Sequence, residues 1–162
     1  MIQNNKSKLG VLIPGMGSVA STFICGVIAC NKGLSKPIGS MTQMGSIRLG
    51  KRTENRTPLV KDFVSTVDMQ NLVFTGWDIN DENVYDIALK SKVLKNELLE
   101  ELKPELKKIN VLKGVFDQKY VRRLSGDWVK YGESKLDLAN QVMSDIKTFN
   151  KNSKIDSNVM IW

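Results

Sequence analysis

The chain has 162 residues, enough for one domain with its own core, and its apolar (41%) and charged (25%) fractions are those of a globular protein. It contains no histidine, which excludes histidine-dependent catalysis and histidine-ligated metals, and the spacing of its two cysteines, Cys25 and Cys30, fits no zinc site. The net charge of +7 and the pI near 9.4 permit an anionic ligand or partner, but such a lysine excess usually indicates a solvated surface. We expect a cytoplasmic protein with reduced, buried thiols and no bound metal.

The first informative pattern is an apolar strand at residues 8–13 that runs into Gly15-Met16-Gly17-Ser18-Val19-Ala20, with a helical pattern following to Asn31. A strand, a Gly-x-Gly-x-x-Ala turn and a helix in this order are typical of dinucleotide binding. The first glycine allows the tight turn, the second lets the backbone approach a pyrophosphate, and Ala20 lets the helix pack close to the strand. The helix N-terminus adds unpaired N–H groups and a partial positive charge.

Residues 9–31 carry no charge, so two membrane-related interpretations compete with the nucleotide turn. A transmembrane helix needs roughly 20 apolar residues, and here Pro14 and several glycines interrupt the run. A lipoprotein signal would use Cys30 as its lipidation site, but the Pro-Gly-Met-Gly break falls inside what should be its continuous apolar core. The lipoprotein remains an alternative, and we expect no membrane association.

The segment after the first helix is irregular and polar over about residues 35–70 and contains a basic loop at 48–61. A nucleic-acid-binding protein that uses this loop is a second alternative. The loop lacks interleaved aromatic side chains for stacking on bases, and the chain contains no nucleic-acid-binding motif. We therefore expect no nucleic-acid partner.

The rest of the chain alternates strand and helix patterns. Strands are predicted at residues 72–78 and 158–162, the second of them buried. Between them we expect one helix from a cap at Asp81 or Asn83 through Leu102, and Pro104 either kinks this helix or starts a new one that continues through Leu106 and Ile109. A turn is expected at Gly114–Asp117. A last helix then presents one apolar face made of Leu136, Ala139, Val142, Met143, Ile146 and Phe149.

This order of elements predicts an α/β fold, a Rossmann-like doubly wound parallel sheet with helices on its faces. The final pattern stops within a strand, so we expect the sheet to be incomplete at the C-terminus. Residues 1–162 would then form a partial dinucleotide-binding domain with an irregular insertion at about 35–70.

The acidic partner of a dinucleotide-binding turn is expected about 20 residues further on, at the end of the second strand, where it bonds a ribose hydroxyl. Residues 36–40 contain no acid, and the first carboxylate after the turn is Glu54, in the basic loop. Asp78 ends the second strand pattern, the right topological place after a long insertion. It could equally cap the following helix, and spacing alone leaves both interpretations open.

Four stretches match a known family in order and in approximate separation: Leu9–Ala29, Thr42–Gly50, Val73–Ile79 and Leu112–Asp117. By these stretches the chain resembles the N-terminal part of the myo-inositol phosphate synthases (inositol-3-phosphate synthases) over nearly all of residues 8–162. The Gly-Trp-Asp-Ile and Thr-Gln-x-x-Ser-Ile-Arg segments are far more specific than the glycine turn.

The resemblance implies an NAD-dependent isomerase that converts D-glucose 6-phosphate to 1D-myo-inositol 3-phosphate by oxidation, aldol cyclisation and reduction. It implies that Asp78 binds the adenosine ribose, that Val115 lies beside the adenine, and that a homotetramer forms. It assigns the pyrophosphate turn to Gly15, Met16, Gly17, Ser18 and Val19.

Two departures from the family pattern matter. The turn is one residue shorter than the eukaryotic Gly-x-Gly-Gly-Asn-Asn-Gly form, so Ser18 and Val19 stand where asparagines would. The family's catalytic domain, with its lysines, lies beyond residue 162. We therefore expect no catalytic residue in this chain and little activity from these residues alone.

Overall fold

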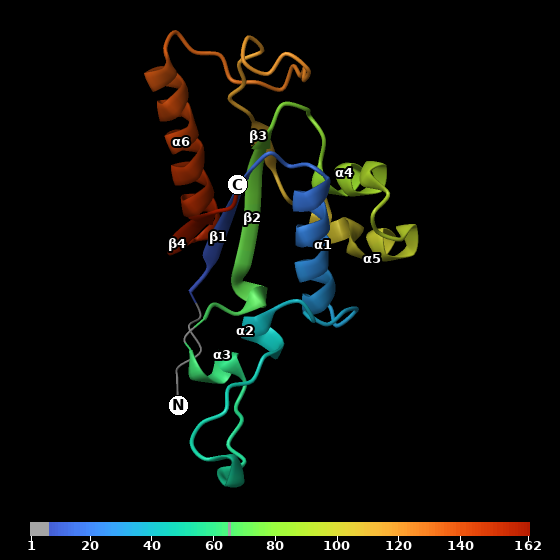
Figure 1. Cartoon of the computed structure of the whole chain (residues 1–162). Helices are drawn as coiled ribbons and strands as arrows, with labels where there is room; N and C mark the ends of the chain where they lie inside the picture. Colours follow the sequence, from blue (N-terminus) through green and yellow to red (C-terminus); the bar gives the residue numbers. More distant parts are fainter. Residues whose placement is uncertain (1–6, 65) are drawn as a thin grey trace.

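The fold is a four-stranded parallel sheet with helices on both faces, described here by a computed structural model for residues 7–64 and 66–162 (Figure 1). The strand order is β3-β2-β1-β4, and all three strand pairs are parallel. The predicted α/β, Rossmann-like fold is confirmed. The strands are β1 (Leu9–Pro14), β2 (Leu72–Asp78), β3 (Val111–Lys113) and β4 (Ser157–Met160).

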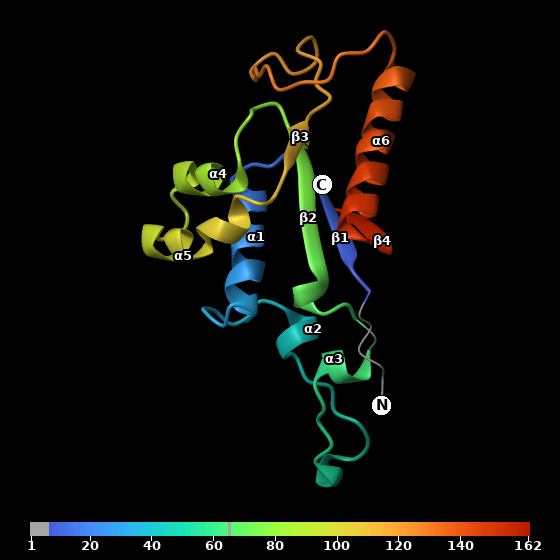
Figure 2. The same ribbon diagram turned by 180° about the vertical axis from the view of Figure 1, so that it is seen from behind.

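Three helices cover one face of the sheet: α1 (Ser18–Asn31), α4 (Val84–Ser91) and α5 (Asn96–Leu106). Helix α6 (Lys135–Ser153) covers the opposite face, as the two views of Figures 1 and 2 show. The insertion between α1 and β2 is not wholly irregular. It contains the short helices α2 (Met41–Met44), η1 (Arg52–Glu54), α3 (Val60–Phe63) and η2 (Met69–Asn71).

The core lies between the sheet and the helices α1, α4 and α5. Its fully buried side chains include Ile24 of α1 and Leu99, Leu102 and Leu106 of α5, which recur at helical spacing. Cys25 is also buried, and burial raises the pKa of its thiol to about 11. Both cysteines are free, and Cys30 is half-buried, so the expectation of a buried thiol is confirmed for Cys25.

The single helix predicted from residue 84 through Leu102 is wrong. Its apolar pattern is divided between α4 and α5, and Lys92 between them adopts a left-handed conformation with φ +54°. The break reverses the chain so that both short helices pack on α1 and on each other. The cap prediction holds for Asn83, whose side chain accepts a hydrogen bond from the Asp86 amide at 3.1 Å.

Three further expectations for the C-terminal half need correction. Strand β3 was not predicted, and Gly114, expected in a simple turn, pairs with Val129 in a parallel bridge. The last strand is 157–160 and is exposed rather than buried, since β4 is an outer strand of the described sheet. On α6, Val142, Ile146 and Phe149 are half-buried, whereas Leu136, Ala139 and Met143 are exposed, because Leu138 and Asp145 share the face that turns inward.

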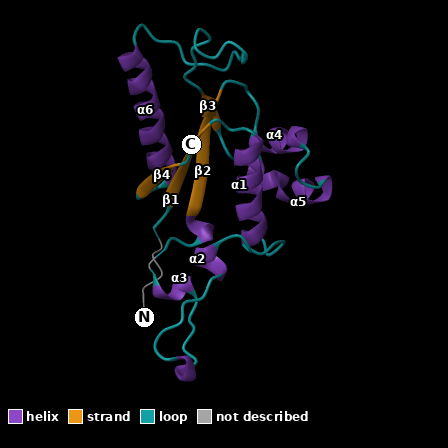
Figure 3. Cartoon of the chain, viewed as in Figure 1, coloured by secondary structure: helices purple, strands orange, loops and turns teal. Residues whose placement is uncertain are grey.

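The basic segment forms a hairpin-like loop that extends from the body of the domain (Figure 3). Its two arms are joined by hydrogen bonds from the Ile47 amide to the Pro58 carbonyl (3.0 Å) and from the Leu49 amide to the Arg56 carbonyl (2.8 Å).

None of the helices within residues 7–64 and 66–162 is both long and apolar enough to cross a membrane.

Gly76 provides a test of how closely the two central strands approach. A Cβ atom at this position would lie 2.2 Å from the Ile13 carbonyl oxygen and 2.6 Å from Cε of Met16. We expect Gly76→Ala to destabilise the protein by about 3 kcal/mol, because backbone of β1 would have to move. The control is Gly26→Ala in the exposed middle of α1, where a Cβ meets nothing within 4 Å; it should stabilise by about 0.5–1 kcal/mol. Urea unfolding measures both, and equal midpoints would contradict the described packing.

The cysteines provide a second test of the fold. With a pKa near 11, Cys25 is thiolate in only about one molecule in a thousand at pH 8, and the thiolate is the reactive form. Iodoacetamide should therefore modify Cys30 before Cys25 in the native protein, and Cys25 should react readily only after unfolding. Peptide mass spectrometry after timed quenching gives the two rates. Equal native rates would contradict the burial of Cys25.

Candidate functional site

The glycine turn lies at the carboxyl end of β1, where the strand passes into α1. Gly15 has a φ of +92°, a left-handed conformation that favours glycine, and its amide donates to the Trp77 carbonyl at 2.8 Å. Gly17 is the N-cap of α1, and its carbonyl oxygen accepts a hydrogen bond from the Ser21 amide at 2.9 Å. No side chain caps this helix and its first turn contains no acidic residue, so no charge within the helix itself offsets its positive end.

The open space above the turn fits an anionic group. A Cβ atom built on Gly15 or on Gly17 would meet nothing within 4 Å, so a ligand can approach the backbone at both positions. Met16 between them is 1% exposed and anchors the turn in the core. Ala20 is buried as expected, whereas the side chain of Val19 is 87% exposed.

Asp78 lies at the end of β2, directly beside this turn. Its Oδ1 oxygen accepts hydrogen bonds from the Ile79 amide (2.8 Å), the Asn80 amide (3.1 Å) and Nδ2 of Asn80 (3.3 Å). These three donors hold the carboxylate in one orientation. All three donors meet Oδ1 rather than Oδ2.

Two adjoining pockets meet at Asp78. The larger has a volume of about 540 Å³ and contains Gly15, Asp78 and Val115 together with Val142 and Met160. The smaller has a volume of about 220 Å³ and contains Met16, Gly17, Ser18 and Asp78. The structure thus brings together six of the seven residues proposed from the sequence, and Val19 lines neither of these pockets.

The larger pocket lies where the strand order reverses, since β2 and β4 lie on opposite sides of β1. Ligands of open α/β sheets bind at this point, outside the carboxyl ends of the strands. Sequence reasoning missed Met160 and Val142, which line it from β4 and α6. The sequence predicted a helix around Val142 and a strand around Met160. It did not show that this helix and this strand both lie beside Gly15.

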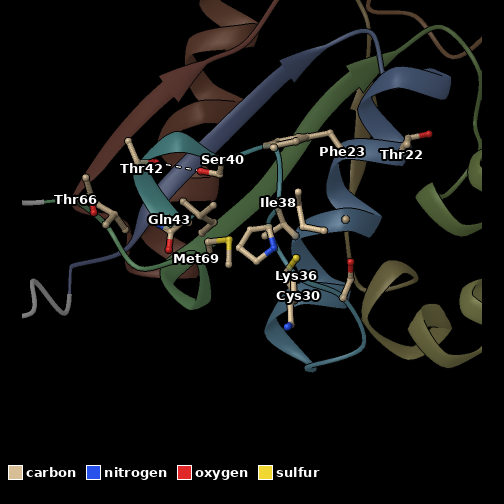
Figure 4. Close-up of a pocket in the computed structure, with 17 residues that line it drawn as sticks. Thr22, Phe23, Cys30, Lys36, Ile38, Ser40, Thr42, Gln43, Thr66 and Met69 are labelled. Carbon is tan, nitrogen blue, oxygen red and sulfur yellow. Dashed lines mark hydrogen bonds between the residues drawn. The ribbon is translucent and has the colours of Figure 1, made fainter. Parts of the chain in front are cut away.

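A cavity of about 690 Å³ lies elsewhere, between the outer side of α1 and the insertion (Figure 4). Phe23 and Cys30 line it from α1, and Ile38 and Ser40 face them from the insertion. Although larger, it has no glycine turn and no carboxylate among its described lining residues, and Lys36 is the one charged side chain among them. The residues that line the pockets, rather than the pocket volumes, therefore favour the pockets at Asp78 as the nucleotide site.

Within the described part of the chain no cluster of three or more histidine, cysteine or acidic residues is arranged to hold a metal.

Residues 9–162 match the model of an NAD-binding family described as myo-inositol-1-phosphate synthase. The chain belongs to this family. The resemblance noted in the sequence is thereby confirmed, and NAD is the cofactor that the family assigns to this domain.

Relatives agree with this assignment, and a solved structure has the same fold. The chain is 37% identical over 156 residues to inositol-3-phosphate synthase 1 of Bacteroides thetaiotaomicron, covering 96% of this chain and 36% of that protein. It is 33% identical over 170 residues to a probable inositol 3-phosphate synthase isozyme 3 of Arabidopsis thaliana, covering 96% and 33%. The crystal structure of inositol-3-phosphate synthase from Caenorhabditis elegans has the same fold, with a TM-score of 0.84 at 24% identity over 98% of this chain and 34% of that one. The chain thus spans about a third of the length of these relatives.

Asp78 is the residue whose replacement tests the site. Asp78→Asn should weaken NAD binding by roughly ten- to hundredfold, because a charge-assisted hydrogen bond is worth about 1.5–3 kcal/mol. The control is Asp81→Asn, which removes the same charge three residues further on from an exposed side chain that lines neither pocket. Isothermal titration calorimetry measures both variants. Unchanged affinity in Asp78→Asn would remove this carboxylate from the site.

Proposed function

We propose that this chain is the NAD-binding part of an inositol-3-phosphate synthase, which converts D-glucose 6-phosphate to 1D-myo-inositol 3-phosphate. The observation that carries the proposal is the placement of Asp78 between two pockets, one of which contains Gly15 and the other Gly17. Family membership and the open backbone of the turn support the same cofactor.

Each part of the site has a distinct task. The amides of residues 15–18 and the N-terminus of α1 bind the pyrophosphate, and the glycines let it approach the backbone. Asp78 accepts a hydrogen bond from the adenosine ribose, and Val115 lies against the adenine. When bound, NAD would supply the hydride acceptor for the oxidation and, as NADH, the hydride donor for the reduction. The turn would hold the cofactor at its pyrophosphate and Asp78 would hold it at its adenosine ribose.

The remaining parts of the reaction belong to a second domain. Because the chain spans about a third of its relatives, we place the glucose 6-phosphate site and the catalytic residues in the part of those proteins that this chain does not match. On this proposal residues 1–162 hold the cofactor and supply no catalytic residue. The complete enzyme is a cytoplasmic homotetramer that serves inositol and phospholipid biosynthesis.

The proposal predicts NAD binding without turnover by the 162 residues. NAD at one hundred times its dissociation constant should stabilise the fold by about 2.7 kcal/mol, measured as a shift of the urea midpoint. NADP should bind more weakly, because its 2′-phosphate would lie against the Asp78 carboxylate. No inositol phosphate should form from glucose 6-phosphate and NAD. Lack of any NAD-dependent shift would overturn the cofactor assignment, and measurable turnover would overturn the division of tasks.

A further inference from the structure

Asp145 joins α6 to strand β2 of the sheet, close to the cofactor pockets. Its Oδ2 oxygen accepts a hydrogen bond from the indole Nε1 of Trp77 at 2.8 Å and lies 2.8 Å from Nζ of Lys130. The Lys130 and Asp145 side chains are only 11% and 20% exposed. Removing one partner of such a pair leaves a poorly solvated charge behind, so this contact fixes where α6 lies.

Each partner of Asp145 leads directly to a residue of the proposed NAD site. Trp77 is followed in β2 by Asp78. The Lys130 amide donates to the Gly114 carbonyl at 2.8 Å, and the Gly114 amide donates to the Asp78 carbonyl at 2.8 Å. Gly114 is followed by Val115, so one carboxylate is connected to both residues proposed for the adenosine half.

Asp145 also sets the third side of the same pocket. Val142 lies one helical turn before it on α6 and lines the 540 Å³ pocket together with Trp77 and Gly114. A second contact holds this part of α6 in place, because Nε2 of Gln141 donates to the Tyr131 carbonyl at 2.8 Å. The parts of the pocket formed by Asp78, Val115 and Val142 therefore all depend on contacts around the Asp145 side chain.

We infer that Asp145 is a positioning residue for the adenosine half of the NAD site, an inference that rests on the proposed function. It contributes no contact to the ligand. Its role is to hold Asp78, Val115 and the α6 wall at fixed separations, with Trp77 and Lys130 as the intermediaries.

The test is NAD and AMP titration of Asp145→Asn by calorimetry. We expect both affinities to fall by a similar factor, about five- to tenfold, as coupled neighbours do. Loss of a negative charge alone should raise the affinity for an anionic ligand. A fall in affinity would therefore have the opposite sign to the charge effect. The control is Glu105→Gln, which removes an equal charge from the ion pair with Lys32 (3.2 Å) on the other face of the sheet and should leave both affinities unchanged.

A double variant separates positioning from general loss of structure. If Asp145 acts through Asp78, adding Asp145→Asn to Asp78→Asn should cost much less affinity than it costs alone. An equal cost in both backgrounds would overturn the inference. So would unchanged NAD affinity in a folded Asp145→Asn variant.

If Asp145→Asn does not fold, Trp77→Phe provides the same test, since it removes the indole donor and keeps an aromatic ring in place. It should lower NAD and AMP affinity together, and unchanged affinity would overturn the inference. Failure of the unmodified chain to bind NAD would instead overturn the proposed function, and the inference with it.

Discussion

The hydrogen bond from the Gly15 amide to the Trp77 carbonyl is the contact on which the rest of the site depends. It extends the pairing of β1 with β2 by one residue, at the point where the left-handed φ of Gly15 turns the chain toward α1. The same contact sets Asp78 beside the N-terminus of that helix. A positive helix end and a fixed carboxylate therefore lie at one sheet edge, the combination that a pyrophosphate and a ribose require.

The two faces of the sheet contribute differently to this edge. Helices α1, α4 and α5 form the apolar core and support the turn from below, through Met16 and Ala20. Helix α6 has no fully buried residue: half-buried apolar side chains such as Phe149 pack toward the sheet, and Asp145 adds polar contacts to Trp77 and Lys130. Polar contacts are more directional than apolar packing. They therefore define the position of a pocket wall, while their net contribution to the free energy of unfolding is small.

The parts predicted from sequence are those with a strong local pattern. Strand β1, the turn, α1 and β2 follow from periodicity and glycine chemistry, and the strand pattern predicted Asp78 at the end of β2. Strand β3 has three residues, too few to show an alternation of apolar and polar side chains. The break at Lys92 contains no glycine or proline that would predict it. The contacts of Asp145 were equally hidden, because an aspartate on an amphipathic helix normally faces water. Those features depend on residues distant in sequence, which local patterns do not encode.

The most direct measurement is NAD titration of the ¹⁵N-labelled chain, followed through its backbone amide resonances. The account predicts that the first and largest shifts belong to Gly15, Gly17 and Asp78, with Val115 next, while amides along the α1–insertion cavity stay in place. Shifts confined to that cavity, around Phe23 and Ile38, would contradict it. They would move the cofactor to the opposite end of the domain, away from the glycine turn.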